Sequence, residues 1–286
     1  MSKKKNSLKI IKSAREMQKV ALSIKGKREI AFVPTMGALH NGHLSLVKKA
    51  KTIADIVVVS IFINPIQFSE KNDLKNYPKN LQKDLIELKE IGVDYVFIPK
   101  AEEIFGLDFQ TKVIVEDLQQ HLCGLKRKNH FDGVTTIVLK LFNIVKPHKA
   151  LFGKKDMQQL LIIKKMVEDM NIDIKIIPHR IIREKNGLAM SSRNTLLNKK
   201  EKELSANIYK GLKIGKSMYN KKSNTKSINI KRSIRSFYKE VGIRNIEYVE
   251  IMNPKKMTYP KEPSKKDFIA VAVRIGKTRL IDNLEF

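Results

Sequence analysis

Apolar runs alternate with amphipathic stretches along the first two thirds of the chain. Near-continuous apolar residues at 30–34 and 56–63 are typical of strands covered on both faces of a parallel sheet. The full pattern predicts strands at 30–34, 56–63, 94–99 and 172–178 and helices at 43–54, 81–91, 134–145 and 157–170. Such alternation predicts an α/β fold with a doubly wound, Rossmann-like parallel sheet and right-handed crossovers.

The pattern changes after about residue 186. Amphipathic helices are expected at 196–222 and 228–241, joined by a polar segment at 221–229, and strands at 246–252 and 268–275. We therefore predict two domains, a Rossmann-like domain over residues 1–186 and a smaller α+β domain over residues 187–286.

Length and composition exclude several classes of protein. With 286 residues, 42% of them hydrophobic, the chain can bury a sizeable core, which excludes global disorder. The longest apolar run, residues 56–68, already contains Ser60, Asn64 and Gln67, so no membrane span is expected. Charged residues interrupt what would be the apolar part of a secretion signal, and we expect a cytoplasmic protein. Cys123, the single cysteine, excludes an internal disulfide.

The net charge is +28, from 57 basic and 29 acidic residues. Such an excess raises the prospect of a polyanionic partner. A nucleic-acid surface would need clustered Arg with interleaved aromatic residues, but Lys dominates here, aromatic residues make up 7% and Trp is absent. We interpret the lysines as solvated surface and predict no nucleic-acid partner. A basic nucleic-acid-binding protein remains the alternative from another functional class.

The strongest chemical signal is PTMGALHNGH at residues 34–43, between a predicted strand and a predicted helix. Ligands of open parallel sheets bind beyond the carboxyl ends of the strands, and a helix N-terminus favours anions. Gly37 and Gly42 allow close approach of the backbone, and His40 and His43 can both reach one phosphate group. The segment predicts a phosphate-binding turn, with a pair of capping or surface histidines as the alternative.

Three further segments have plausible binding chemistry. FINPIQF at 62–68 offers neutral amides that can bind hydroxyls and carboxylates, LFGKKDMQQL at 151–160 offers a mobile cation, and LAMSSRN at 188–194 offers hydroxyls and a guanidinium for a polyphosphate. Taken alone, FINPIQF is better explained as an ordinary turn, LFGKKDMQQL is equally compatible with a capped helix start, and LAMSSRN is a weak signal that an ordinary N-cap also explains. Together with the first segment they indicate an α/β nucleotide-binding enzyme.

In this order, the segments resemble the pantothenate synthetase (pantoate–β-alanine ligase) family. The matching segments are MGALHNGH, FINPIQF, Tyr77-Pro78, HFDGV at 130–134, KLFNIVKP at 140–147, FGKKDMQQL and MSSRN. The resemblance implies a nucleotidyltransferase-like fold with an H-x-G-H turn at 40–43. It also implies an AMP-forming amide ligation of (R)-pantoate and β-alanine through a pantoyl adenylate, with ATP as substrate, Mg²⁺ as metal and a homodimer as the assembly.

The resemblance also implies roles for individual residues. His43 would be the catalytic acid, assisted by His40 and Lys155. Gln67 and Gln159 would hold pantoate, Gln67 would also lie near β-alanine, and Asp84 would lie near the metal. The first domain would bind ATP and pantoate, and the second would close over the site. The residues implied for ATP are Met36, Gly37, Ala38, Leu39, His40, Asn41, Gly42, His43, Gly153, Lys154, Lys155, Asp156, Ile182, Met190, Ser191, Ser192 and Arg193.

Two positions depart from the family pattern. Lys128-Asn129 stands where a Pro-Gly pair is common, and Asn tolerates the left-handed backbone that Gly would provide. Cys123 stands where an acidic residue is common. Another H-x-G-H nucleotidyltransferase, acting on a phosphorylated acceptor, stays the alternative among enzymes. The paired Gln residues argue against it, because a dianionic acceptor would attract more Arg or Lys.

Overall fold

The computed structural model describes residues 8–68, 71–221, 225–255 and 257–286. The chain divides into two compact units that are interleaved in sequence. The first contains residues 1–116, 127–154 and 162–180, and the second contains residues 117–126, 155–161 and 181–286. The main division thus falls at residue 180, and two short segments of the predicted first domain belong to the second unit. Among the described residues, no helix is both long enough and apolar enough to cross a membrane.

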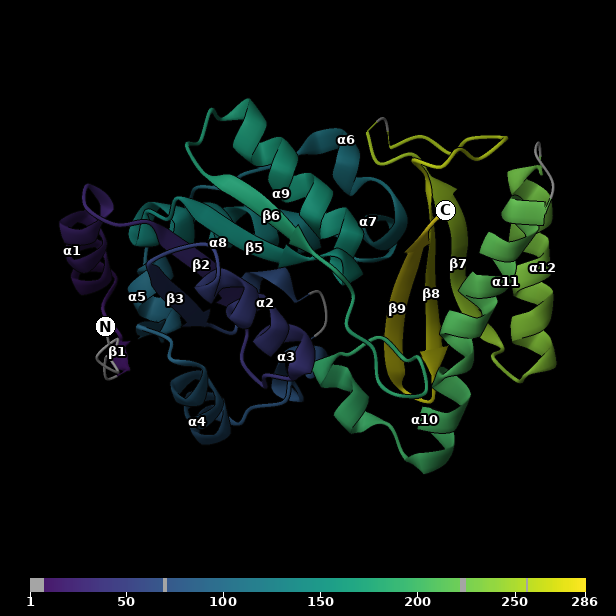
Figure 1. Cartoon of the computed structure of the whole chain (residues 1–286), viewed down its shortest axis with the longest axis horizontal. Coiled ribbons are helices and arrows are strands. Elements are labelled where there is room, and N and C mark those ends of the chain that lie inside the picture. Colours follow the sequence, from purple (N-terminus) through teal and green to yellow (C-terminus); the bar gives the residue numbers. More distant parts are fainter. Residues whose placement is uncertain (1–7, 69–70, 222–224, 256) are drawn as a thin grey trace. The chain divides into compact units, whose positions relative to one another are not determined.

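Among the described residues of the first unit, parallel strands form one sheet in the order β1-β4-β3-β2-β5-β6 (Figure 1). The strands are β1 (Lys9–Ile11), β2 (Ile30–Thr35), β3 (Ile56–Ile61), β4 (Tyr95–Phe97), β5 (Lys149–Gly153) and β6 (Lys175–His179). The associated helices are α1 (Ala14–Lys25), α2 (Asn41–Lys51), α3 (Lys71–Lys75), α4 (Leu81–Ile91), α5 (Ala101–Phe105), α8 (His130–Val145) and α9 (Met157–Asp169), whose first residues belong to the second unit. The predicted doubly wound α/β fold is confirmed.

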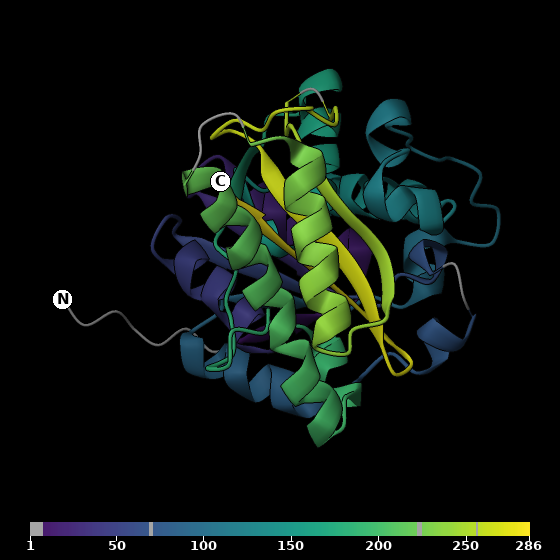
Figure 2. The same cartoon turned by 90° about the vertical axis from the view of Figure 1, so that its right-hand side faces the viewer.

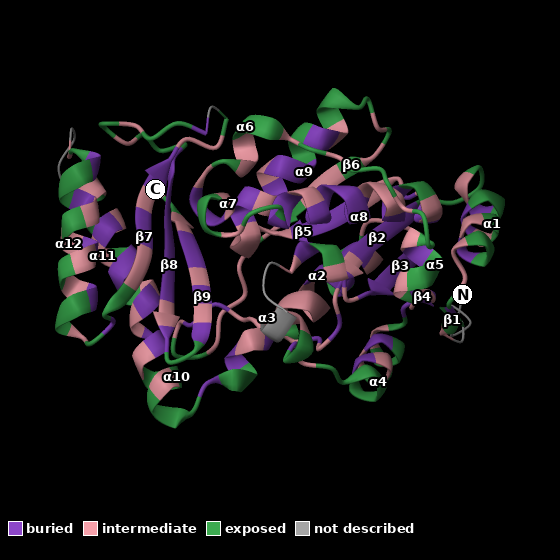
Figure 3. Cartoon of the chain, turned by 180° about the vertical axis from the view of Figure 1, so that it is seen from behind, coloured by how far each residue is buried: buried purple, intermediate pink, exposed green. Residues whose placement is uncertain are grey.

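The central strands β2 and β3 are buried on both faces, which explains their near-continuous apolar residues (Figure 3). On one face, Val33 of β2 belongs to a cluster with Val47 of α2 and Leu88 of α4. On the other face, the ring of Phe32 meets Phe142 of α8 edge to face. Neighbouring residues of one strand therefore point into two separate apolar layers.

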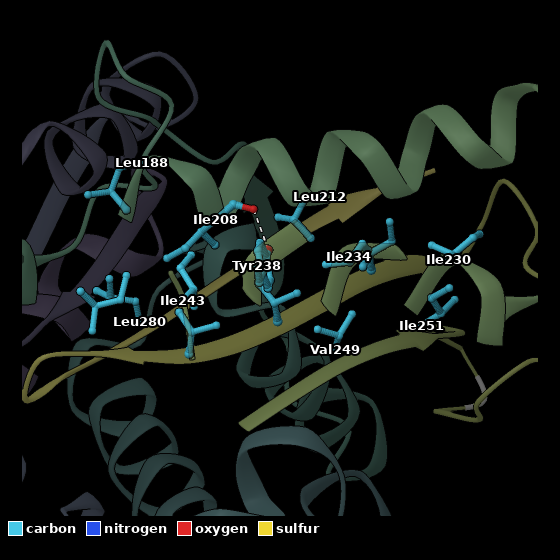
Figure 4. Packing of buried hydrophobic residues seen from close by; sticks show 14 of the residues in the cluster. Leu188, Ile208, Leu212, Ile230, Ile234, Tyr238, Ile243, Val249, Ile251 and Leu280 are labelled. Carbon is cyan, nitrogen blue, oxygen red and sulfur yellow. Dashed lines mark hydrogen bonds between the residues drawn. The ribbon is translucent and has the colours of Figure 1, made fainter. Parts of the chain in front are cut away.

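The second unit has an antiparallel sheet in the order β7-β8-β9, formed by β7 (Asn245–Met252), β8 (Phe268–Ile275) and β9 (Thr278–Glu285). Helices α11 (Asn207–Lys221) and α12 (Ser227–Glu240) lie side by side across it (Figure 2). Between the helices and the sheet, Leu212, Ile234 and Val249 are buried with Tyr238, whose hydroxyl donates to the carbonyl of Ile208 at 2.7 Å (Figure 4). Leu280 of β9 belongs to the same core.

Two elements of this unit differ from the predictions. The helix expected at 196–222 is replaced by two helices, α10 (Lys199–Ser205) and α11, which follow the 3₁₀-helix η3 (Ser192–Leu196). Asn198 begins α10 with a capping box, and the chain turns at Ala206 before α11 begins. The apolar pattern does not predict strand β9, since Asp282 and Asn283 interrupt its alternation. The polar connection predicted at 221–229 includes residues 222–224, which lie outside the described residues.

Candidate active site

The turn after β2 is built by two left-handed residues, Gly37 at φ +78° and Ala38 at φ +49°. A Cβ atom at Gly37 would lie 3.0 Å from Cγ2 of Ile61 and 3.2 Å from Oδ2 of Asp84. Glycine is required at this position for two reasons: the backbone has a positive φ, and it packs closely against β3 and α4. The turn delivers the chain to the N-terminus of α2.

Asp84 of α4 lies beneath this turn and is 1% exposed. Its Oδ2 accepts the backbone N–H of Ala38 at 2.9 Å, and its Oδ1 accepts that of Leu39 at 2.8 Å. Burial raises the pKa of the Asp84 carboxyl above its ordinary value, while the two backbone donors oppose that shift. Both oxygens of Asp84 are thus used to hold the turn.

The two histidines of the turn stack on each other. Their ring centroids are 4.0 Å apart and the ring planes are inclined by 30°. His40 is the N-cap of α2, and its Nδ1 accepts the N–H of Gly42 at 3.1 Å. Since Nδ1 accepts, a neutral His40 carries its proton on Nε2, which is then the donor of the ring. The pair therefore places two imidazole rings at a helix end that already favours anions.

Gln67 lies in the 3₁₀-helix η1 (Pro65–Gln67), and its side-chain orientation is fixed by Asn64. The Asn64 Nδ2 donates to Oε1 of Gln67 and to the carbonyl of Gly133, both at 3.0 Å. The carbonyl end of the Gln67 amide is thereby occupied. Its Nε2 is directed to the sulfur of Met36, so Gln67 presents an N–H group beside the phosphate-binding turn.

The backbone of Gln67 is held by α8. The Nδ1 of His130 lies 2.7 Å from the carbonyl oxygen of Gln67, and the guanidinium of Arg127 lies 2.9 Å from Nε2 of the same ring. Because a guanidinium only donates, Nε2 accepts and Nδ1 donates. A Cβ at Gly133 would lie 2.5 Å from the carbonyl oxygen of Ile66, so only glycine permits this approach. These contacts give the HFDGV segment a physical role that its residue types alone did not reveal.

The second unit carries most of the other predicted ATP residues. In the 3₁₀-helix η2 (Lys154–Asp156), the ammonium of Lys155 lies 3.6 Å from Oδ1 of Asp156. The N–H of Met190 donates to the carbonyl of Ile182 at 2.9 Å, which brings these two predicted positions together. Ser191 caps η3 by accepting the N–H of Arg193. The structure thus joins Ile182 to the MSSRN segment, although they are separated in sequence.

Of the two glutamines that begin α9, Gln159 is half-buried, whereas Gln158 is 5% exposed. The Oε1 of Gln158 accepts the N–H of Cys123, and its Nε2 donates to the carbonyls of Leu118 and His121. Gln158 therefore fixes the segment 117–126. Sequence reasoning missed this residue, because adjacent identical side chains give no local sign of which one points inward.

The two departures from the family pattern are accommodated. Asn129 has φ +60°, the left-handed conformation expected of it. The sulfur of Cys123 lies 3.2 Å from the Tyr248 hydroxyl and 3.6 Å from a nitrogen of Arg279. Burial raises the pKa of Tyr248, so its hydroxyl stays protonated at neutral pH.

No three His, Cys, Asp or Glu side chains within the described ranges gather in an arrangement that could hold a metal ion. The two oxygens of Asp84 are engaged with backbone donors. The prediction that Asp84 lies near a metal stays a prediction.

Comparison with known proteins places these features in a family. The sequence model described as pantoate-beta-alanine ligase matches residues 9–285. The chain is 46% identical over 280 residues to a pantothenate synthetase of Thermodesulfovibrio yellowstonii, covering 97% of this chain and 99% of the relative. It is 49% identical over 258 residues to the pantothenate synthetase of Aquifex aeolicus, covering 90% of each.

Solved structures of pantothenate synthetases are similar to this chain over nearly its whole length. The pantothenate synthetase of Thermus thermophilus has a TM-score of 0.91 at 34% identity, covering 97% of this chain and 99% of that one. The pantoate-beta-alanine ligase of Francisella tularensis, complexed with beta-gamma ATP and beta-alanine, has a TM-score of 0.80 at 34% identity and covers 98% of both chains.

The geometry of the turn predicts that Asp84→Asn destabilises the metal-free protein. An amide has one acceptor oxygen, so one of the N–H groups of Ala38 and Leu39 would face an NH₂ group. We expect the free energy of unfolding to fall by about 1–3 kcal/mol, measured by urea denaturation in EDTA without nucleotide. The exposed Asp108→Asn is the control and should stay within about 0.5 kcal/mol of wild type. Equal stability of the two variants would show that Asp84 does not anchor the turn.

Proposed function

Since the chain belongs to the pantoate-beta-alanine ligase family, we propose that its His-Gly-His turn and its amide side chains perform the family reaction through a pantoyl adenylate. The chain is an ATP-dependent, AMP-forming ligase that joins pantoate and β-alanine. The observation that carries the proposed mechanism is the stacked His40–His43 pair at the N-terminus of α2, over a turn held by Asp84.

In the first proposed step, a carboxylate oxygen of pantoate attacks the α-phosphorus of ATP. The bond from that phosphorus to the bridging oxygen of the β-phosphate breaks, and pyrophosphate leaves with the electron pair. His40, His43 and Lys155 stabilise the charge that builds on the phosphates, with His43 as the acid. The ATP is bound by residues 36–43, 153–156 and 190–193, with Ile182 near the adenine.

In the second proposed step, the amine of β-alanine attacks the carbonyl carbon of the adenylate. The carbon–oxygen bond to the phosphate breaks, AMP leaves with the electron pair, and the new amide nitrogen loses its proton. Gln67 is assigned to β-alanine as well as to pantoate, so the amine reaches the activated carbonyl from the pocket where pantoate was held. Positioning of this kind can contribute much of the rate without a protein nucleophile.

Selection of the acid rests on neutral amides. Because Asn64 occupies Oε1 of Gln67, the Nε2 of Gln67 is the group that can donate to an oxygen of pantoate. Gln159 is assigned as the second amide. A neutral donor orients the carboxylate and leaves its charge available for attack, whereas a bidentate Arg would hold the reactant in a strong ion pair.

A magnesium ion is also part of the proposal: it would enter the site with ATP, with Asp84 nearby, and would offset phosphate charge. The homodimer and the cytoplasmic location that the sequence suggests are also retained as predictions.

An isotope experiment tests the adenylate. With pantoate labelled by ¹⁸O in its carboxylate, the oxygen that attacks phosphorus stays on phosphorus when the amide forms. We expect one labelled oxygen in AMP, and pyrophosphate release that requires pantoate but not β-alanine. Label in inorganic phosphate or pyrophosphate, or AMP without label, would contradict this pathway.

The charge-stabilising groups should act mainly on the first step. We expect His43→Ala and Lys155→Ala to slow adenylate formation by about 10²–10³, the scale for one preorganised donor, measured as pyrophosphate release in a single turnover. The reaction of preformed pantoyl adenylate with β-alanine serves as the control and should be less affected. Wild-type adenylation in His43→Ala would remove this residue from the mechanism.

The orientation of the Gln67 amide gives a prediction about pantoate. Gln67→Glu keeps an oxygen for Asn64 but replaces the outward N–H with a second oxygen. We expect the KM for pantoate to rise about 5- to 150-fold, the range for a polar partner left unmade, while the KM for ATP changes little. Steady-state titrations of each substrate measure this. An unchanged KM for pantoate would mean that the acid binds elsewhere.

A further inference from the structure

Strand β9 places two polar residues next to each other in the interior of the second unit. Asp282 is 3% exposed and Asn283 is 4% exposed. Successive side chains of a strand point to opposite faces, so each of these groups needs its own partner on its own side of the sheet. Their partners belong to two different segments that we assign to ATP.

Asp282 is bound by Arg183. The two guanidinium nitrogens lie 2.6 and 3.0 Å from the two carboxylate oxygens, which is a bidentate pair. Arg183 also donates to the carbonyl of Gly187 and lies over the ring of Tyr209 at 3.7 Å. Arg183 directly follows Ile182, and its strand-like bridge to Ala189 leads to the MSSRN segment. Asp282 therefore fixes the base of that segment.

Asn283 is bound to the other segment. Its Nδ2 donates to the backbone carbonyl of Lys155 at 2.9 Å, and its own N–H donates to Oδ1 of Asp282 at 2.8 Å. One dipeptide of β9 thus holds the backbone at residue 155 and the turn that follows Ile182.

We propose that Asn283 is a positioning residue for Lys155, paired with Asp282, which positions residues 182–193 through Arg183. The inference rests on the role proposed for Lys155. A lysine side chain is long and flexible, so its ammonium reaches a phosphate reproducibly only if its backbone is held. A displacement of about 1 Å at a reacting centre can cost about 10²-fold in rate. The bond from Asn283 supplies the required restraint on η2.

The direct test uses two substitutions of Asn283. Asn283→Ala removes the donor, and Asn283→Asp keeps the side-chain volume but turns an oxygen towards the carbonyl of Lys155. We expect both to slow pantoate-dependent pyrophosphate release by about 10- to 100-fold at saturating substrates. The KM for pantoate should change less than about twofold, because neither the contacts of Gln67 nor the side chain of Gln159, which lies on the following helix α9, is altered directly. Asn283→Asp preserves the test if Asn283→Ala folds poorly.

Ser227→Ala is the matched control for a purely structural loss. The Ser227 hydroxyl is also buried in the second unit and also donates to a backbone carbonyl, that of Pro260, at 2.6 Å. Its removal should lower the melting temperature while the rate of pyrophosphate release stays at the wild-type value. All rates are compared at a temperature where circular dichroism shows each variant to be folded. A rate loss in Ser227→Ala as large as that in Asn283→Ala would overturn the inference.

A double-mutant cycle separates this inference from the function on which it rests. If Asn283 acts through Lys155, Asn283→Ala should slow the Lys155→Ala enzyme by less than about threefold further, because the two losses are coupled. If the fold-losses of rate in the two single variants multiplied fully in the double variant, the positioning role of Asn283 would be overturned, but the role of Lys155 would not. The positioning role would also be overturned if Lys155→Ala slowed pyrophosphate release while Asn283→Ala released it at the wild-type rate. Wild-type rates in Lys155→Ala would instead overturn the role of Lys155, and the inference with it.

Discussion

The Asp84 carboxylate determines the geometry of the phosphate-binding turn. It is buried near the N-terminal end of α4 and accepts N–H groups from two consecutive residues, Ala38 and Leu39, at 2.9 and 2.8 Å. Without that acceptor, two donors would be left unsatisfied in a left-handed turn. With it, the chain enters α2 so that His40 caps the helix and stacks on His43. The position of both imidazoles therefore depends on one carboxylate far away in the sequence.

Buried polar residues also hold two other residues that we assign to substrate binding, Gln67 and Lys155. The amide of Gln67 is oriented by Asn64 and its backbone is held by His130. The backbone of Lys155 is held by Asn283. In each case a buried polar residue satisfies a backbone or amide group, so the side chain that faces substrate does not have to be restrained by substrate itself. Preorganisation of this kind reduces the entropy that must be lost at the transition state.

Cys123 departs from the residue type expected at its position, yet the charged side chain next to it still has an ion-pair partner. The thiol lies beside Arg279, at a position where the family resemblance led us to expect an acidic residue. Arg279 keeps a carboxylate partner, because Glu247 of β7 lies 2.9 Å from its Nε and also binds Arg274. Glu247 therefore supplies the Arg279 guanidinium with a counter-charge even though Cys123 is not an acidic residue.

The sequence by itself determined strands β2, β3, β4 and β6 of the parallel sheet and the place of the phosphate-binding turn, whereas β1 and β5 were not among the predicted strands. Apolar periodicity marks β2 and β3, and it gives the bounds of α4, with Gly92 in a left-handed cap, because these signals are local. The turn follows β2 directly, so covalent continuity brings its histidines to the carboxyl edge of the sheet. The sequence did not predict the break at Ala206, because the apolar positions of α10 and α11 continue with one helical period across it.

Tertiary structure alone decided which polar side chains hold the site. In the sequence, nothing distinguishes the anchoring roles of Asp84, Gln158 and Asn283 from those of solvated residues, and the family resemblance suggests only a metal for Asp84. Their partners lie 46, 35 and 128 positions away along the chain. A hydrogen bond over such a distance leaves no periodic trace in the sequence, because it depends on where the folded elements place two groups that share no local pattern.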